Sequence, residues 1–390
     1  MTLNLDRSDW KRFSLGEIAR ASKEKVDPAD GSVNRFVAGE HMDTDDLKLH
    51  RWGDVGEVDL GPAFHRRFRP GQVLYGSRRT YLRKVAVADF DGVCANTTFV
   101  VDTRDEGVLL QQFLPFIMCS EPFHTFAIAE SKGSVNPYVN WSDIERYEFD
   151  LPSLDEQKRL ADLLWAVAHH RNAIASLPGE LGRGYDIWLE CRLADVPTAP
   201  LEEVLQLQNG RPVASSLYGK GEFPLLRPGD MNADGSVRWS STSVSIPQEF
   251  ADQYRDWVLG PGDLVINMTA QTLDDRFLGR VCRMHDRALL NQRIGRLTGD
   301  DRVSEDFVFV ALRSAQFADW VARKSEGSKV KHMHWRHITD YPMPVPSPDE
   351  QAAIVAEADS WAFGRRQLTT EASALTELRM AMLTEIFGAN

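Results

Sequence analysis

A segment in the middle of the chain recurs near its end, and this repeat constrains the fold more than any other feature of the sequence. The residues NWSDIERYEFDLPSLDEQ (140–157) align without a gap with HWRHITDYPMPVPSPDEQ (334–351). Trp141 therefore corresponds to Trp335, and each later residue corresponds to the one 194 positions further on. This period is far longer than the few tens of residues of a solenoid repeat. We therefore expect a duplication of one domain that is followed by one helix.

Earlier segments of the two halves also correspond, and they occur in the same order. SLGEI (14–18) matches PLEEV (200–204), and RPGQVLYGS (69–77) matches GPGDLVINM (260–268). Each half then continues with short β-rich runs separated by Pro, Gly, Asn and Asp, and with one apolar helical segment. The pattern predicts an α+β fold with two similar globular domains and two helical arms. The predicted boundaries are 1–152 for the first domain, 153–195 for the first arm, 196–346 for the second domain and 347–390 for the second arm.

The repeated segment has the signature of a helix start called a capping box. In this motif a Ser hydroxyl accepts the N–H of the third helical residue, whose carboxylate accepts the Ser N–H in return. Ser153 and Glu156 fit the motif in the first half, and Ser347 and Glu350 fit it in the second. Pro348 suits the first helical position, where its missing N–H has no consequence. The acidic residues are therefore interpreted as caps rather than as catalytic carboxylates.

Each arm has a row of mainly apolar residues spaced seven apart, which is the pattern of long helices that pack along a seam. We expect the two arms to pair with each other as antiparallel coiled-coil-like helices, although ordinary amphipathic surface helices are the alternative. Pro178 and the glycines of LPGELGRG (177–184) predict an interruption of the first arm. The seam residues are Leu160, Val167, Ile174, Leu181 and Trp188 in the first arm and Ile354, Trp361, Leu368, Leu375 and Met382 in the second.

Positive charge is concentrated locally in a chain whose net charge is −12. The run FHRRFRPGQVLYGSRRTYLRK (64–84) contains basic residues, aromatic residues and no acid. Arginine makes bidentate contacts with phosphates and with guanine, so the run predicts a DNA-binding surface, with a solvated face as the alternative. The candidate DNA-binding residues are Arg66, Arg67, Arg69, Arg78, Arg79, Arg83, Lys84 and Lys132 in the first half and Arg211, Arg276, Arg280, Lys324, Lys329 and Lys331 in the second.

Sequence signatures of catalysis are missing. The chain has no P-loop, dinucleotide-binding, H-E-x-x-H or G-x-S-x-G motif, and no methyltransferase NPPY motif. Its cysteines are far apart, and His332, His334 and His337 lack acidic or Cys co-ligands, so we expect no metal site. No apolar run reaches the ~18 residues of a membrane span, and the N-terminus lacks the apolar region of a signal peptide. The expected protein is a cytoplasmic non-enzyme without a cofactor of its own.

Several of these segments, in this order and twice over, make the chain resemble the specificity (S) subunit of type I restriction–modification systems. The resemblance covers nearly the whole chain. It rests on WKRFSLGEI (10–18), RPGQVLYGSRRTYLRKVAV (69–87), LPSLDEQKRLADLL (151–164) with its second copy, FPLLRPGDM (223–231) and PGDLVINMTAQTLDDRFLGRV (261–281).

The resemblance implies two target-recognition domains, each of which reads one half of a bipartite DNA site, held apart by paired helices. It also implies a non-catalytic subunit that docks two methyltransferase (modification) subunits, with restriction subunits of motor and nuclease function outside them. S-adenosylmethionine would be bound by the methyltransferase. An arm of about 24 residues spans roughly 36 Å, close to one turn of B-DNA. The alternatives are an S-like DNA-recognition protein or a protein-interaction adaptor of another defence or modification system.

Overall fold

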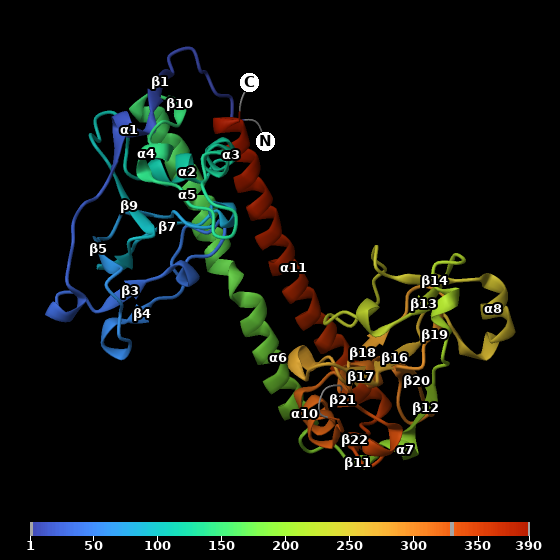
Figure 1. Ribbon diagram of the computed structural model, residues 1–390. Coiled ribbons are helices and arrows are strands. Elements are labelled where there is room, and N and C mark those ends of the chain that lie inside the picture. Colours follow the sequence, from blue (N-terminus) through green and yellow to red (C-terminus); the bar gives the residue numbers. More distant parts are fainter. Residues whose placement is uncertain (1–2, 328–330, 389–390) are drawn as a thin grey trace. The chain divides into compact units, whose positions relative to one another are not determined.

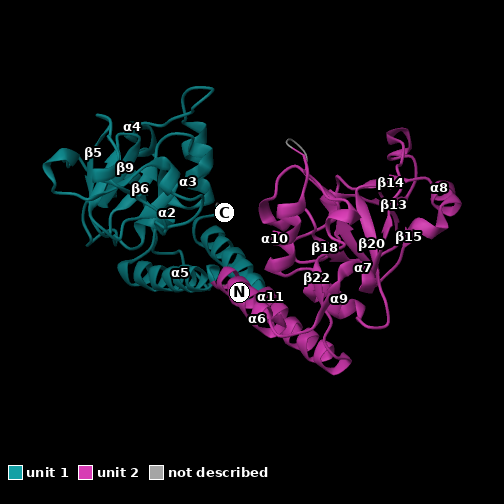
Figure 2. Ribbon diagram, turned by 90° about the horizontal axis from the view of Figure 1, so that it is seen from below, with its two compact units in different colours: residues 1–176, 368–390 teal, residues 177–367 magenta. Residues whose placement is uncertain are grey.

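The computed structural model describes residues 3–327 and 331–388. These residues form two compact units (Figure 2): unit 1 comprises residues 1–176 and 368–390, and unit 2 comprises residues 177–367. Each unit combines a globular region with one part of each arm. The arms therefore pack as parts of the two units and do not form a compact body of their own.

Unit 1 contains two four-stranded sheets and one two-stranded sheet (Figure 1). Their strand orders are β2-β9-β6-β7, β4-β3-β8-β5 and β1-β10, and β3–β8 is the parallel pair. The strands are β1 Lys11–Ser14, β2 Ala19–Ala21, β3 Arg35–Val37, β4 Gly53–Asp54, β5 Phe64–Phe68, β6 Val73–Gly76, β7 Val85–Val87, β8 Gly92–Ala95, β9 Thr98–Thr103 and β10 Glu148–Leu151. The helices are α1 Leu15–Ile18, α2 Leu114–Met118, α3 Glu121–Ala129, α4 Trp141–Ile144 and α5 Leu154–Ala175.

Unit 2 repeats this topology strand for strand. Its sheets have the orders β12-β20-β16-β18, β14-β13-β19-β15 and β11-β22, with β13–β19 as the parallel pair, and β17 and β21 form a further two-stranded sheet. The strands are β11 Thr198–Pro200, β12 Leu205–Asn209, β13 Phe223–Leu226, β14 Val244–Ile246, β15 Val258–Leu259, β16 Leu264–Asn267, β17 Thr269–Ala270, β18 Val281–Arg283, β19 Ala288–Leu290, β20 Ile294–Gly299, β21 Lys331–His332 and β22 Pro342–Pro344. The helices are α6 Leu177–Leu193, α7 Leu201–Val204, α8 Gln248–Gln253, α9 Glu305–Ala311 and α10 Ala315–Lys324. Helix α11, Pro348–Phe387, contributes to both units.

The arm helices supply part of each hydrophobic core. In unit 1, Leu160 and Leu164 of α5 and Met382 of α11 are buried in one cluster with Phe116 and Phe123. Burial of a large apolar side chain contributes about 1.5–3 kcal/mol, so these helices stabilise the globular region as well as extending from it. Among the described residues no helix is both long enough and apolar enough to cross a bilayer.

The arms pair antiparallel in both units, as the seven-residue spacing predicted. In unit 1, His170 of α5 lies 2.8 Å from Glu371 of α11. In unit 2, the indole N–H of Trp188 donates to Glu357 at 2.9 Å, and Leu181 lies beside Gly364. Positions therefore rise along one helix as they fall along the other. Every predicted seam residue is buried or half-buried, and the half-buried ones are Leu181, Trp188, Trp361, Leu368 and Leu375.

The capping box predicted at the start of the first arm does not form. Ser153 is the N-cap residue, but its side chain makes no capping bond. Glu156 instead accepts two bonds, of 2.7 and 2.6 Å, from the guanidinium of Arg159. This bidentate ion pair holds the pKa of Glu156 below its usual range and competes successfully with a single backbone N–H.

The second arm has no such competitor, because Ala353 stands where the first arm has Arg159. Glu350 therefore accepts both the N–H of Ser347 at 2.9 Å and its hydroxyl at 2.7 Å. The Ser347 hydroxyl is thus a donor to the carboxylate, whereas the predicted box made it an acceptor. One half of the box, the bond from the Ser347 N–H to Glu350, is present.

The interruption of the first arm lies upstream of its predicted position at 177–184. Only Ser176 separates α5 from α6, and its backbone remains in the right-handed helical region. Pro178 is the second residue of α6 and has no N–H to offer the carbonyl of Ile174, so the hydrogen-bond ladder is broken just before it. The glycines that follow are helical. A Cβ on Gly184 would lie 3.3 Å from the Trp361 ring, so this glycine allows close packing against α11.

The glutamine of the repeated DEQ segment has a structural role that the sequence pattern did not reveal. Gln157 is fully buried, its amide donates to the carbonyls of Val108 and Pro152, and its oxygen accepts the N–H of Leu110 at 3.0 Å. Gln351 makes the equivalent three bonds to the backbone in unit 2. Each glutamine joins an arm helix to the loop before the apolar helix of its own unit.

Replacement of Gln157 with leucine is expected to destabilise unit 1 by about 3 kcal/mol, because it leaves three buried backbone groups unpaired. Hydrogen–deuterium exchange of peptides from α2 and α5 measures this change within the two-unit protein. Lys158→Ala, at the neighbouring exposed position, is the control and is expected to change the same peptides little. Unchanged protection of α5 in the Gln157→Leu protein would contradict the assigned role.

Candidate nucleic-acid interface

Two loops of unit 1 lie side by side at the end of strand β6. The basic loop, residues 77–84, follows β6, and the Gly-Ser loop, residues 130–140, follows α3. The N–H of Arg79 donates to the carbonyl of Pro137 at 2.6 Å, and the N–H of Val139 donates to Ser77 at 3.0 Å. Lys132 and Tyr138 exchange two backbone bonds across the Gly-Ser loop. The two loops thus form one hydrogen-bonded platform.

Unit 2 contains the same platform at the corresponding place. The loop after β16 (268–280) starts with strand β17, which pairs with β21 in the second Gly-Ser loop (324–334). Thr269 is opposite His332, as Arg78 is opposite Tyr138 in unit 1. The fold therefore presents the same arrangement of loops twice, with different side chains on each copy.

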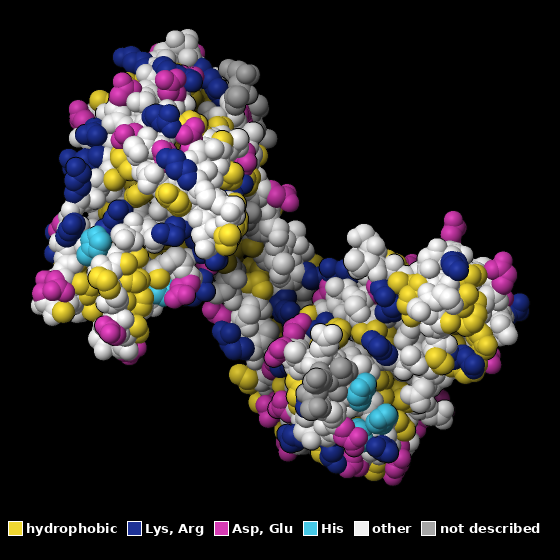
Figure 3. All heavy atoms as spheres, in the orientation of Figure 1, with side chains coloured by type: hydrophobic (Ala, Val, Ile, Leu, Met, Phe, Trp, Pro, Cys, Tyr) yellow, Lys and Arg dark blue, Asp and Glu magenta, His cyan; other side chains and the backbone are white. Residues whose placement is uncertain are grey.

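Three of the seven basic residues of the run 64–84, namely Arg67, Arg69 and Arg83, pair with acids from distant parts of the chain. Arg67 pairs with Asp91 at 2.6 Å, and Arg69 pairs with Glu24 at 2.6 Å. The absence of acids from the run itself therefore did not mean a free positive surface. On the face of unit 1 in Figure 3, basic and acidic side chains are interspersed.

Four other predicted DNA-binding residues of unit 1 are also engaged within the fold. Arg66 is half-buried, donates to the carbonyl of Thr98 at 2.8 Å, and has its pKa lowered by burial. The ammonium of Lys132 lies 2.9 Å from Asp143 and keeps the pKa of that carboxyl low. The remaining two are Arg83, which pairs with Asp45 and Glu121, and Lys84, which donates to the carbonyl of Gly39. Each of these four side chains is thus held by a contact within unit 1.

Arg78 and Arg79 remain as the exposed cations of the platform. Arg79 donates to the side chain of Asn136 at 2.9 Å, and Arg78 lies 6.0 Å from the centre of the Tyr138 ring. Within the described part of the chain neither guanidinium forms an ion pair. Tyr81 and Tyr138 are exposed beside them. Two neighbouring guanidinium groups beside exposed aromatic rings can contact both phosphates and base edges.

The basic residues predicted in unit 2 are less available. Arg276 forms a bidentate pair with Asp186 of α6, and Arg280 is largely buried against Asp275. Lys324 pairs with Asp340 at 3.0 Å, and Lys329 lies outside the described residues. In the described ranges, Lys331 on β21 and Arg211 have no acidic partner. Arg211 packs 4.2 Å from the centre of the Tyr254 ring and 4.7 Å from that of Trp257.

The two Gly-Ser loops are fixed by the same ion pairs with opposite polarity. The sequence ESKGS begins the first loop at Glu130, and KSEGS begins the second at Lys324. Glu130 pairs with Arg146 at 2.5 Å, whereas Lys324 pairs with Asp340 at the equivalent place. At the second position, Lys132 pairs with Asp143 in unit 1, and Glu326 lies 3.2 Å from the ring of His337 in unit 2. The charges of each loop therefore complement those of the residues it contacts in its own unit.

Glu130→Lys is expected to destabilise unit 1 by about 0.5–1 kcal/mol, because it places a lysine beside Arg146 in a pair that is partly exposed. Glu130→Lys combined with Arg146→Asp recreates the polarity of unit 2 and is expected to restore the stability. Thermal unfolding of the two proteins and of Arg146→Asp alone completes a double-mutant cycle. Additive losses in the double variant would show that this pair does not fix the loop.

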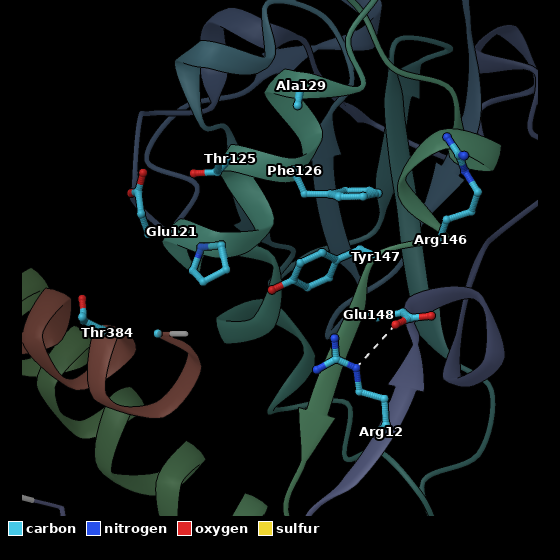
Figure 4. A pocket seen from close by; sticks show the side chains of 11 residues that line it. Arg12, Glu121, Thr125, Phe126, Ala129, Arg146, Tyr147, Glu148 and Thr384 are labelled. Carbon is cyan, nitrogen blue, oxygen red and sulfur yellow. Dashed lines mark ion pairs between the residues drawn. The ribbon is translucent and has the colours of Figure 1, made fainter. Parts of the chain in front are cut away.

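A pocket in unit 1 lies away from this platform (Figure 4). It has a volume of about 790 Å³ and is lined by α3, the β1–β10 sheet and the end of α11. Phe126 and Tyr147 form its apolar wall, and Arg12 pairs with Glu148 at its rim. In residues 3–327 and 331–388 no group of three or more His, Cys, Asp or Glu side chains is placed to hold a metal ion.

The geometry defines a class of protein with a duplicated α+β domain, a repeated two-loop platform and arm helices that pair antiparallel. Two comparisons with known proteins show the same class. In sequence, the chain is 21% identical over 260 residues to the type I restriction enzyme MjaVIII specificity subunit of Methanocaldococcus jannaschii, which covers 60% of each chain. It is 26% identical over 153 residues to the EcoDI specificity subunit of Escherichia coli, which covers 39% of this chain and 33% of that one. The matched regions thus span less than two thirds of these relatives.

In structure, the chain matches the type I S subunit of M. genitalium over 100% of both chains, with a TM-score of 0.61 and 15% identity. A structure from a study of type I restriction–modification complex assembly gives a TM-score of 0.61, 20% identity and coverage of 97% of this chain and 98% of that one. No family model matches the sequence. These likenesses confirm the predicted fold class and the resemblance to type I specificity subunits.

Proposed function

We propose that the chain is the DNA-recognition subunit of a type I restriction–modification complex and that each unit reads one half of a bipartite site. The observation that carries this proposal is the two-loop platform, which the fold builds once in each unit on equivalent strands. A duplicated reader suits a site with two half-sites, and different side chains on the two platforms suit half-sites of different sequence. Arg78 and Arg79 are the principal contacts in unit 1, and Arg211 and Lys331 are those in unit 2.

The negative net charge limits DNA contact to the few basic side chains that have no acidic partner in the described residues. With a net charge of −12, the chain repels the phosphate backbone wherever its basic side chains are neutralised. Binding therefore depends on few contacts, and specific contacts with bases matter more than general attraction. We also assign the arm helices two roles, namely to set the gap between the half-sites and to dock two methyltransferase subunits.

Catalysis belongs to the partners in this proposal. The chain lacks the sequence motifs of nucleases and methyltransferases. A methyltransferase that modifies a base takes that base out of the duplex, which requires DNA that is already positioned by a reader. The methyltransferase subunits would bind S-adenosylmethionine, the restriction subunits would join outside them, and the complex would act in the cytoplasm.

The test uses the full chain purified with its methyltransferase subunits and incubated with a library of randomised duplexes. Sequencing of the bound fraction is expected to show one enriched motif with two specified halves and a fixed gap. Association of the subunits without any enriched DNA motif would overturn DNA recognition and would identify the chain as a protein-interaction adaptor.

A further inference from the structure

Two adjacent acids, Asp45 and Asp46, join the basic loop of unit 1 to both arm helices. They lie between β3 and β4, in a segment that runs along the basic loop. The hydroxyl of Thr44 donates to the carbonyl of Leu82 at 2.9 Å, and the N–H of Asp45 donates to the carbonyl of Arg83 at 3.3 Å. The backbone around the two acids thus follows the end of the loop that carries Arg78 and Arg79.

Asp45 lies beside two arginines, of which Arg379 is buried and Arg83 is half-buried. The Nε of Arg83 lies 3.1 Å from its carboxylate, and Arg379 of α11, which is 4% exposed, donates to its backbone carbonyl. Burial, together with these two arginines, lowers the pKa of the nearby His124 to about 3, so this ring is neutral and supplies no charge. Asp45 thus contacts both Arg83 and Arg379. Glu121 also contacts Arg83, at 2.8 Å.

Asp46 points to the other arm helix. Its carboxylate lies 3.1 Å from the guanidinium of Arg171 on α5, and Arg171 also donates to the hydroxyl of Thr376 on α11 at 3.1 Å. The Asp46 side chain is 11% exposed and that of Arg171 is 28% exposed, so water screens this pair only partly. The two acids together connect the loop to α5 and α11.

Unit 2 also connects this loop to an arm helix, but through different residues. Arg276, in the loop that corresponds to the basic loop, forms bonds of 3.0 and 2.7 Å with Asp186 of α6. An arginine of the loop is therefore fixed to an arm helix in both units, through Asp45 in one and directly in the other. Both units thus connect this loop to an arm helix, although they use residues at different positions to do so. An incidental surface ion pair would not be expected to recur in this way.

We propose that Asp45 and Asp46 are positioning residues for DNA recognition, which hold Arg78 and Arg79 in place by fixing the basic loop to α5 and α11. The inference rests on the proposed function. Removal of the Asp45 carboxylate leaves Arg379 buried without this acid and leaves Arg83 with Glu121 as its acidic partner. The loop then moves away from the helices, and the contacts of Arg78 and Arg79 with DNA lose their geometry.

The experiment compares Asp45→Asn and Arg171→Gln with the unaltered chain, each in complex with the methyltransferase subunits and the randomised duplex library. Arg171→Gln is the milder variant, since its side chain is partly exposed, and it provides the test if Asp45→Asn does not fold. Asp43→Asn is the matched control, because Asp43 is exposed, pairs with Arg51 and contacts neither the loop nor the arms in the described structure. Circular dichroism establishes that each variant is folded.

For a folded Asp45→Asn or Arg171→Gln protein, sequence preference is expected to weaken in one half-site only, with binding to the original motif reduced about tenfold, the equivalent of one charge-assisted hydrogen bond. Asp43→Asn is expected to match the unaltered chain. A folded variant with both half-sites unchanged would overturn the positioning role while leaving the proposed function intact. If the unaltered chain itself enriched no motif, the proposed function would fail, and this inference with it.

Discussion

Lengthening both arms by one helical turn is expected to widen the gap between the two half-sites and to leave the sequence of each half-site unchanged. One turn is about four residues and adds roughly 6 Å, which corresponds to about two base pairs of B-DNA. The insertions belong after Ser176 and after Gln367, where the chain passes from one unit to the other in each arm. Selection from the duplex library measures the new gap directly.

Insertion into one arm alone is the control for this experiment. The antiparallel pairing of the longer arm then cannot keep its register in both units, because the extra turn in one helix has no counterpart in the other. We expect a loss of stability and of DNA binding without a new preferred gap. A doubly extended protein that is folded and still selects the original gap would show that the arms do not set the spacing.

Replacement of Arg78 and Arg79 with alanine is expected to weaken DNA binding by about one to two orders of magnitude. Each lost phosphate contact also lowers the slope of log K against log salt concentration by about one, so the double variant loses about two. Titration of a labelled duplex at several salt concentrations gives both quantities. The two residues have this effect because they are the exposed cations of the unit 1 platform without an acidic partner in the described structure.

Arg67 and Arg69 provide a matched control for Arg78 and Arg79. They belong to the same basic run, but Asp91 and Glu24 neutralise them. Their replacement with alanine is expected to leave the salt slope unchanged. Equal effects of the two double variants would contradict the distinction between paired and free arginines on which the interface rests.

The features that could be predicted from the sequence are those that repeat or are periodic. The 194-residue repeat gave two units of the same topology, and the seven-residue spacing identified the residues at which α5 and α6 meet α11. Local signals were less dependable. Glu156 has the spacing of a capping residue, but Arg159 offered it a stronger partner within the same helical turn.

Charge neutralisation could not be predicted, because it depends on contacts between distant segments. The run 64–84 contains no acid, yet Glu24, Asp45 and Asp91 reach it from elsewhere in the fold. Asp45 and Gln157 were missed for a related reason. Each is important through bonds to residues far away in the sequence, and a single acid or amide has no local pattern that reveals this. Comparison of ESKGS with KSEGS was a usable signal, since the inverted charges indicate paired partners in both copies.

We propose that the two units read two separate halves of one DNA site. Methylation-sensitive sequencing of DNA from cells that carry the chain with its partner subunits tests this proposal. We expect one modified motif made of two specified sequences with a gap of constant length between them. A single continuous motif, or modification without sequence preference, would contradict it.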